Sequence, residues 1–316
     1  MIFDSESVFE DNVITVLKQH GWKDGVLRYP TEQDLLDNWK GILYRNNNDI
    51  DRLGKYPLTD GEMAQIIEQI ETLRTPLALN SFVNGRTVSI TRDNKEDVAH
   101  FGKEISLYIY DRKEIAGGKS TYQIAQQPVY PAKNKMLNSR RGDLVLLING
   151  MPLIHIELKK SGIPVSQATN QIEKYTHEGV FTGLFRLVQI FVAMNPDDAV
   201  YFANPGVDKF NPSYYFHWAD YNNEPICGGQ NPGKDEWKLF IGGTSGCCPF
   251  PWRISSSAST PSPTRQTDAS RCCAATSTSL RTPSLTWCAN AIGNSGQLLR
   301  DDQAAMYGTL PVPEKP

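Results

Sequence analysis

The stretch GDLVLLINGMPLIHIELK, residues 142–159, predicts a β-hairpin and with it the core of the fold. Residues 144–148 form an unbroken apolar run rich in branched side chains, which is typical of a strand buried on both faces. Asn149-Gly150 follows at once, and Asn-Gly is a strong signal for a reversal between two strands. We therefore expect two antiparallel neighbours inside a sheet.

The second strand alternates between apolar and polar or charged side chains. Successive side chains in a strand point to opposite faces, so the apolar residues at 154, 156 and 158 share one face. His155, Glu157 and Lys159 share the other face. Glu157 and Lys159 therefore lie one pleat repeat apart on the same side of the sheet.

Asp143, at the head of the first strand, needs a particular register to join them. A two-residue turn pairs Ile148 with Met151, and counting back from that pair places Asp143 opposite Ile156, on the wrong face. A one-residue offset, from a three-residue loop or a β-bulge, brings Asp143 opposite Glu157. A site formed by these carboxylates therefore predicts such an offset, and a tight hairpin without a bulge would count against it.

Asp143, Glu157 and Lys159 are the set of side chains that hydrolysis of a phosphodiester requires. Mg²⁺ prefers carboxylate oxygens, and a bound divalent cation neutralises the phosphate and yields hydroxide near neutral pH. The lysine would orient or deprotonate the attacking water, or stabilise negative charge. The alternative is that strand ends carry charges for solubility. Glu-x-Lys alone favours that view, whereas Asp143 and the helix that follows favour a nuclease site.

A helix is expected after the hairpin. Ser166 is its expected N-cap, and residues 167–175 read QATNQIEKY, with Gln171 and Tyr175 four apart on one helical face. Glu-x-Lys followed by Gln-x-x-x-Tyr resembles the RecB-like branch of the PD-(D/E)XK nuclease superfamily. The hairpin and the helix together resemble the N-terminal nuclease domain of the restriction subunit (R, or HsdR) of type I restriction enzymes, over roughly residues 1–240.

That resemblance implies a fold and a set of roles. The fold would be α+β, with a restriction-endonuclease-like mixed central sheet flanked by helices. Asp143 and Glu157 would bind Mg²⁺, Lys159 would be the catalytic lysine, and Gln171 and Tyr175 would support the site or contact DNA. Without the upstream residues, the last two would be interpreted as an ordinary half-buried helix face.

The family usually contributes a further glutamate from its first helix, here residues 5–20. Glu6 and Glu10 are the candidates, and Glu10 borders the apolar stripe of that helix. A solvated glutamate in the first turn, favourable with the helix dipole, is an equal alternative. Glu10 is therefore a candidate for a third metal ligand.

Any attraction to DNA must be local, because the formal net charge is −3. A cluster of basic residues beside the hairpin could contact several DNA phosphates. An ordinary solvated loop that happens to be basic is an equal alternative. The basic residues around the hairpin are Lys133, Lys135, Arg140, Arg141 and Lys160. His155 could also contact DNA, or a group that supports the metal ligands. The favoured interpretation is a histidine whose hydrogen bonds are satisfied and which has no functional role.

Elsewhere the sequence predicts helices followed by strands, an α+β order. Amphipathic spacing predicts helices over residues 5–20 and 31–46, and Thr59-x-x-Glu62 is a capping box for a third helix that Pro76 ends. Further strands are expected over residues 82–90, 105–110, 122–130, 191–194 and 201–204, with Gly117-Gly118 joining the second and third of these.

Composition indicates a cytosolic protein. Residues 1–226 contain no cysteine, so no disulfide framework is expected. The sequence has no run of about 18 apolar residues, and its acidic N-terminus lacks the basic and apolar regions of a signal peptide. We expect a cytoplasmic location and no membrane partner.

The chain changes character near its C-terminal end, so we divide it into a nuclease domain at 1–242 and a foreign-looking tail at 243–316. Of the 32 residues from 255 to 286, 16 are Ser or Thr, and five of the six cysteines lie between Cys247 and Cys288. Adjacent cysteines without histidine partners argue against a zinc site. We interpret the tail as an out-of-frame translation that is disordered, and the neighbouring reading frame of the coding DNA tests this hypothesis.

The sequence contains no Gly-x-x-x-x-Gly-Lys-Ser/Thr loop of the kind that cradles nucleotide phosphates. The full-length family carries an ATP-dependent motor, so the resemblance implies ATP for a full-length protein but not for this chain. Expected partners are double-stranded DNA and the methyltransferase (M) and specificity (S) subunits of a type I complex. Two alternatives stay open: a stand-alone RecB-like nuclease, or a catalytically silent remnant that only binds those subunits or DNA.

Overall fold

A computed structural model describes residues 2–83, 87–109, 120–131, 140–206, 210–217 and 236–243. The helices are α1 (Glu6–Gln19), α2 (Glu32–Asn46), α3 (Asp60–Thr72), α4 (Pro76–Val83), α6 (Val165–His177) and α7 (Glu236–Gly243), with 3-10 turns η1 (Gly183–Leu187) and η2 (Pro212–Tyr214). None of the helices in these ranges is long and apolar enough to cross a membrane. The predicted tail, Gly243 apart, lies outside the described residues, as do Gly117-Gly118, Lys133 and Lys135.

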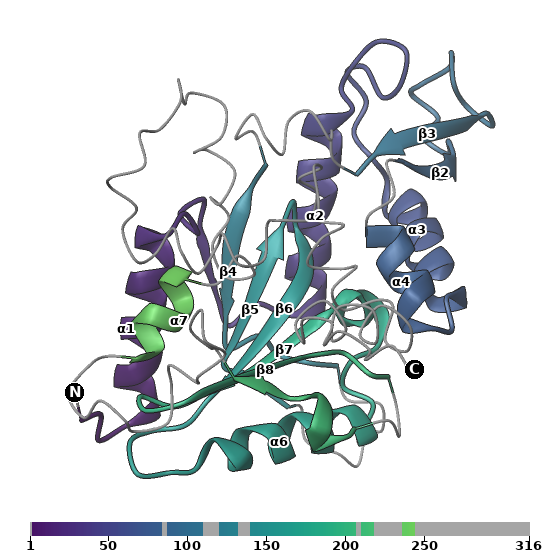
Figure 1. Cartoon of the computed structure of the whole chain (residues 1–316). Coiled ribbons are helices and arrows are strands. Elements are labelled where there is room, and N and C mark those ends of the chain that lie inside the picture. The colour runs from purple at the N-terminus through teal and green to yellow at the C-terminus, as the bar shows by residue number, and fades with distance from the viewer. Residues whose placement is uncertain are drawn as a thin grey trace, which may run out of the picture.

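The strands form one large mixed sheet and one small sheet (Figure 1). They are β1 (Val26–Arg28), β2 (Thr87–Thr91), β3 (Glu104–Tyr108), β4 (Tyr122–Gln126), β5 (Leu144–Ile148), β6 (Met151–Leu158), β7 (Ile190–Met194), β8 (Ala199–Ala203) and β9 (Phe216–His217). The seven-stranded sheet has the order β1-β4-β5-β6-β7-β8-β9. Its β1–β4 and β6–β7 pairs are parallel and the others are antiparallel. The predicted mixed sheet and α+β class are therefore confirmed.

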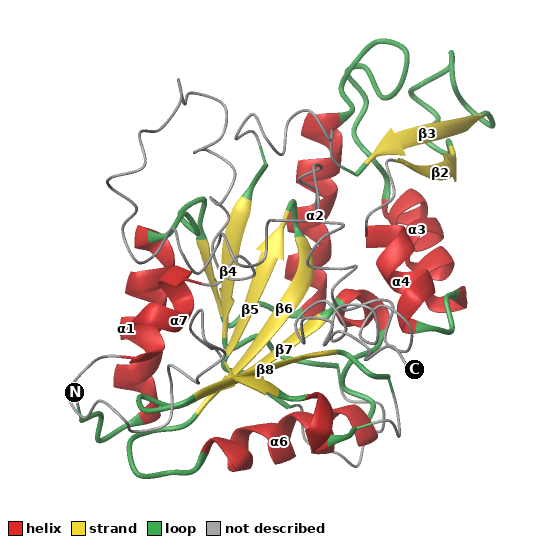
Figure 2. Cartoon of the chain, viewed as in Figure 1, coloured by secondary structure: helices red, strands yellow, loops and turns green. Residues whose placement is uncertain are grey.

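Helices flank the large sheet (Figure 2). On one face, Ile172 of α6 packs in a cluster with Phe191 and Phe202. Trp39 of α2 belongs to the larger core cluster. α1 and α7 lie side by side, where the Phe9 and Trp237 rings are 5.3 Å apart between centroids. The hairpin strand β5 is buried along its whole length, as predicted from its apolar run, and β6 is also buried throughout, including its polar face.

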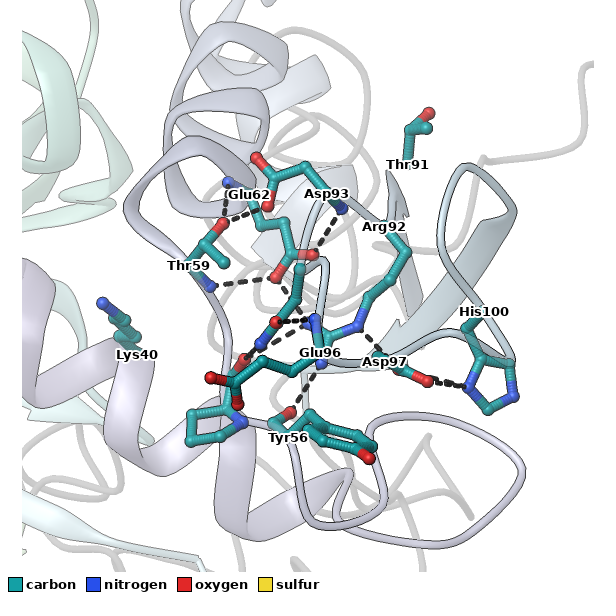
Figure 3. A network of polar contacts seen from close by, with 12 residues as sticks. Lys40, Tyr56, Thr59, Glu62, Thr91, Arg92, Asp93, Glu96, Asp97 and His100 are labelled. Atoms are coloured by element: carbon teal, nitrogen blue, oxygen red, sulfur yellow. Dashed lines mark hydrogen bonds and ion pairs between the residues drawn. The ribbon is translucent and has the colours of Figure 1, made fainter.

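A buried ionic network attaches the β2–β3 sheet to α3 (Figure 3). Arg92, at the end of β2, donates from Nη1 to Glu62 Oε2 at 2.6 Å and from Nε to Asp97 Oδ2 at 2.9 Å. The arginine side chain also donates to the carbonyls of Tyr56 and Pro57. Because all three charged side chains are buried, these contacts fix the position of the small sheet.

The predicted second and third helices are confirmed, and each begins with a capping box, at Thr31 and at Thr59. Two expectations further along were wrong. Pro76 does not end α3; it begins α4, because proline fits the first position of a helix and the Thr75 hydroxyl caps that turn. The predicted strand over 82–90 begins only at Thr87, since α4 extends to Val83.

Two predicted boundaries near the site were also wrong. The strand over 122–130 ends at Gln126, because Gln127 has a φ of 48° that no strand can accommodate. The helix over 167–175 begins earlier, at Val165 after Pro164, so Ser166 lies inside α6 and is not its N-cap. α6 continues to His177, which keeps Gln171 and Tyr175 within one helix.

Two glycines of the same conformation allow a direct test of the packing around the β5–β6 turn. Gly150 (φ 84°) and Gly162 (φ 82°) are both left-handed, but a Cβ at Gly150 would lie 2.8 Å from Trp39 Cα, whereas one at Gly162 meets nothing within 4 Å. We expect Gly162→Ala to lower the free energy of unfolding by about 1 kcal/mol, the backbone cost alone. Gly150→Ala should cost about 2–3 kcal/mol in urea denaturation, because α2 must shift as well. Equal losses would contradict this packing.

Candidate active site

The β5–β6 hairpin has the register offset that the carboxylates require. Ile148 pairs with Met151 across a two-residue turn, but the register shifts between Leu146 and Leu147, so that Leu144 pairs with Ile156. This β-bulge inserts the one extra residue that the sequence argument called for. Continuing the shifted register places Asp143 across from Glu157, so the predicted offset is confirmed.

Asp143 is held by backbone groups of its neighbours. Leu158 N–H donates to Asp143 Oδ2 at 2.6 Å, and Gln127 N–H donates to the Asp143 carbonyl at 2.7 Å. Burial raises the pKa of the Asp143 carboxyl well above its ordinary value, and the nearby charge of Glu157 raises it further. The left-handed conformation of Gln127 thus lets the chain after β4 hydrogen-bond to the backbone of Asp143.

Glu157 is fully buried, and its carboxylate oxygens make no well-aligned hydrogen bond with a described residue, although the Asp143 and Lys159 side chains lie close enough to lower its pKa. Its Oε2 lies 3.2 Å from His155 Nε2 and its Oε1 lies 3.7 Å from Lys159 Nζ. Burial raises the pKa of Glu157 to about 8, although the charge of Lys159 opposes this. A buried carboxylate without partners is costly to ionise, and a cation would offset that cost.

Lys159 lies among carboxylates at the open end of β6. Its Nζ donates to the Leu158 carbonyl at 2.9 Å and lies 3.6 Å from Glu6 Oε1 as well as 3.7 Å from Glu157. Only 11% of its side chain is exposed. The ammonium group therefore lies between the carboxylates of Glu6 and Glu157.

Of the two candidate glutamates on α1, Glu10 is the buried one and Glu6 is half-exposed. Gln126 Nε2 donates to Glu10 Oε1 at 2.7 Å and Gln127 Nε2 donates to its Oε2 at 3.1 Å. Burial raises the pKa of Glu10, and the charge of Glu10 in turn raises the pKa of Asp143. Glu10 is therefore close enough to Asp143 and Glu157 to interact with them electrostatically. The two glutamine amides that bind its carboxylate were not predicted from the sequence. Two adjacent glutamines at the end of a strand were the feature that could have indicated them.

Gln171 and Tyr175 face the site from α6. Gln171 Nε2 donates to the Tyr175 hydroxyl at 2.7 Å, and that hydroxyl donates to the Arg141 carbonyl at 3.0 Å. Burial raises the pKa of Tyr175 to about 12, with the charge of Glu157 adding to the effect. The pair thus tethers the segment that leads into Asp143, and its role toward DNA stays a prediction.

Of the basic residues around the hairpin, the three that the structure describes have protein partners. Arg140 forms two hydrogen bonds of 2.8 Å with Glu178, Arg141 lies 6.0 Å from the Tyr29 ring centroid, and Lys160 reaches the Asp4 carbonyl at 3.5 Å. Their phosphate contacts stay a prediction. His155, by contrast, is fully buried, so it lies behind the site and not on its surface.

The residues present fit a hard divalent cation. Carboxylate oxygens are its preferred ligands, and Glu157 presents two buried oxygens that lack hydrogen bonds. Across the described ranges, no group of three or more His, Cys, Asp or Glu side chains is arranged to hold a metal ion. Asp143 and Glu157 are thus a two-carboxylate set, and Glu10 as a further ligand stays a prediction.

A cavity of about 300 Å³ lies elsewhere, where α4 meets the C-terminal end of α6. Its wall includes Arg74, Asn80, His177, Arg186 and Gln189. None of its lining residues belongs to the carboxylate site. The cavity therefore belongs to a different part of the fold from Asp143 and Glu157.

Comparison with known proteins points to one family. A family model described as "Type I restriction enzyme R protein N terminus" matches residues 4–210. The chain is 31% identical over 232 residues to the Type I restriction enzyme SsaAORF53P endonuclease subunit of Staphylococcus saprophyticus, and 32% identical over 228 residues to the SauCOLORF180P endonuclease subunit of Staphylococcus aureus (strain COL). Each alignment covers 72% of this chain but only 22% of the relative's length. The Type I restriction enzyme EcoprrI endonuclease subunit of Escherichia coli is 28% identical over 254 residues, covering 72% of this chain and 76% of that relative.

Proposed function

The chain belongs to the type I restriction enzyme R protein N-terminus family, and on that premise we propose that it is the DNA-cleaving domain of such an R protein, hydrolysing phosphodiester bonds with Mg²⁺. The observation that carries the proposal is the convergence of Asp143, Glu157 and Lys159. A β-bulge aligns the two carboxylates, Glu157 has no hydrogen-bond partner of its own, and the lysine ammonium lies 3.7 Å away.

Each residue has a physical role in this proposal. Asp143 and Glu157 would hold the cation, which when bound supplies charge neutralisation of the phosphate and an acidified water. Lys159, already beside Glu157, would orient the attacking water and stabilise the charge that develops on the phosphate. Tyr175 holds the backbone of Arg141, and so the approach of the chain to Asp143, in place.

The substrate and partners follow from the family and stay part of the proposal. We infer that double-stranded DNA is the substrate, and that the methyltransferase and specificity subunits supply recognition of the target sequence. ATP-dependent translocation belongs to the motor of a full-length R protein, because this sequence has no Gly-x-x-x-x-Gly-Lys-Ser/Thr loop to cradle nucleotide phosphates.

The test is nicking of supercoiled plasmid DNA by the full chain in the presence of Mg²⁺ or Mn²⁺. We expect nicked circles to accumulate with either ion and to disappear when EDTA is added, because the carboxylates alone cannot activate water. The matched control is Lys159→Ala, purified identically, which should not nick and so excludes a contaminating nuclease. DNA binding without nicking at any concentration of either ion would instead favour the silent remnant.

A further inference from the structure

Behind Glu157 lies a buried pair of polar rings that the proposed chemistry does not use. His155 and Tyr130 are both almost completely buried, and His155 Nδ1 lies 2.9 Å from the Tyr130 hydroxyl oxygen. On its other side, His155 Nε2 lies 3.2 Å from Glu157 Oε2. His155 Nε2 and Glu157 Oε2 are within hydrogen-bond distance, but their geometry is not that of an aligned hydrogen bond. His155 Nε2 and Glu157 Oε2 are complementary groups, and Lys159 lies beside the other carboxylate oxygen, Oε1.

The hydrogen bond to Tyr130 determines which nitrogen of the histidine carries the proton. A buried phenol that accepted from Nδ1–H would leave its own O–H without an acceptor among the described residues, and an unpaired buried donor costs about 1–3 kcal/mol. Tyr130 therefore donates to Nδ1. In the neutral imidazole the remaining proton then lies on Nε2, directed at Glu157.

The surrounding packing prevents the pair from moving away. The Phe185 ring lies 4.6 Å from that of Tyr130, and the Phe181 ring lies 5.4 Å from that of His155, between centroids. Gly142 closes the remaining side: a Cβ there would lie 2.5 Å from the Tyr130 hydroxyl and 2.8 Å from His155 Cε1. The rings thus pack against the residue that immediately precedes Asp143.

From this geometry we propose that Tyr130 and His155 are positioning residues, which hold the Glu157 carboxylate in the orientation that binds a divalent cation. The inference rests on the proposed metal role of Glu157. Tyr130 fixes the histidine tautomer, and the Nε2–H of His155 donates to Oε2 and leaves Oε1 for the cation. Partners of this kind behind metal ligands typically change metal affinity about 10–100-fold when they are removed.

The first experiment measures binding of Mn²⁺ to the full chain by calorimetry and by the loss of free-ion electron paramagnetic resonance signal. His155→Leu removes the donor and should weaken Mn²⁺ binding at least about 10-fold. His155→Gln keeps an N–H where Nε2 stood and should restore most of the affinity. Tyr130→Phe should fall between them. His177→Gln, on the surface of α6, is the matched control and should bind as the unmodified chain does.

The second experiment reads the tautomer directly in the unmodified chain, which avoids any variant that fails to fold. Two-bond ¹H–¹⁵N correlation spectra of histidine-labelled protein should show His155 protonated on Nε2, and Tyr130→Phe should introduce the other tautomer. Protonation on Nδ1 in the unmodified chain, or unchanged Mn²⁺ affinity in His155→Leu, would overturn the inference. If Glu157→Gln also leaves Mn²⁺ affinity unchanged, the proposed metal role itself fails; if only Glu157→Gln weakens binding, the inference alone fails.

Discussion

Replacing Glu157 by glutamine is expected to abolish metal-dependent cleavage and, at the same time, to stabilise the metal-free chain. Cleavage should fall about 1000-fold or more, equivalent to about 4 kcal/mol of transition-state stabilisation, because a neutral amide is a poor ligand for Mg²⁺. Stability should rise by about 1–3 kcal/mol, because Glu157 is fully buried and burial makes its ionised form costly, whereas glutamine carries no charge. Plasmid nicking and urea denaturation in EDTA measure the two effects.

The same substitution should remove a pH dependence. Burial raises the pKa of Glu157 from 4.5 to about 8, so between these values the folded chain holds a proton that the unfolded chain has lost. Glu157 therefore makes the metal-free chain less stable as pH rises from about 4.5 to 8, and its contribution does not change above that range. The raised pKa values of Asp143 and Glu10 act in the same direction. Glu157→Gln should reduce this slope by the Glu157 contribution, and the exposed control Glu68→Gln should leave it unchanged. A Gln variant that is less stable than the original, with the slope intact, would contradict the burial argument.

Much of this site could be predicted because its signals are local in the sequence. The alternation of β6 places Glu157 and Lys159 on one face, and the requirement that Asp143 join them predicted an offset that the β-bulge supplies. Gln171 and Tyr175 are four residues apart and share a helix face wherever the helix begins. The wrong N-cap assignment at Ser166 therefore did not affect the prediction that they lie together.

The remaining features depend on contacts between distant segments. Glu10 meets Gln126 and Gln127 more than 100 residues away, and no periodicity in either segment indicates that pairing. His155 was expected to have no role because only the packed structure shows Tyr130 and Glu157 on its two sides. α4 was missed for a different reason: the apolar residues that follow Pro76 suit a strand as well as a helix.

Replacing Arg92 by methionine is expected to be the most destabilising change in the α3–β2 region. The side chains of Arg92 and Glu62 are 0% exposed, and that of Asp97 is 2% exposed. Removing the arginine leaves the buried Glu62 without its cation and leaves Asp97 with only His100, whose Nδ1 lies 3.0 Å from Asp97 Oδ1. Breaking a buried ion pair in this way typically costs about 3–5 kcal/mol. The matched control is Lys40→Met. Its partner Asp60 is 86% exposed, so the loss should stay below about 1 kcal/mol despite an equally short contact of 2.6 Å.

Adding Glu62→Gln to Arg92→Met distinguishes the cost of an unpaired buried charge from the cost of lost packing. Glu62 also caps α3, since its Oε2 accepts from Thr59 N–H, and glutamine at this position keeps an acceptor for that hydrogen bond. The Arg92→Met, Glu62→Gln double variant should therefore be less destabilised than the sum of the two single variants, by about 1–3 kcal/mol, because one buried charge no longer lacks a partner. Strict additivity in urea denaturation would show that Arg92 acts through its packing and its bonds to the Tyr56 and Pro57 carbonyls. Hydrogen exchange should locate the loss in β2 and β3, since Arg92 connects that sheet to α3 (Figure 3).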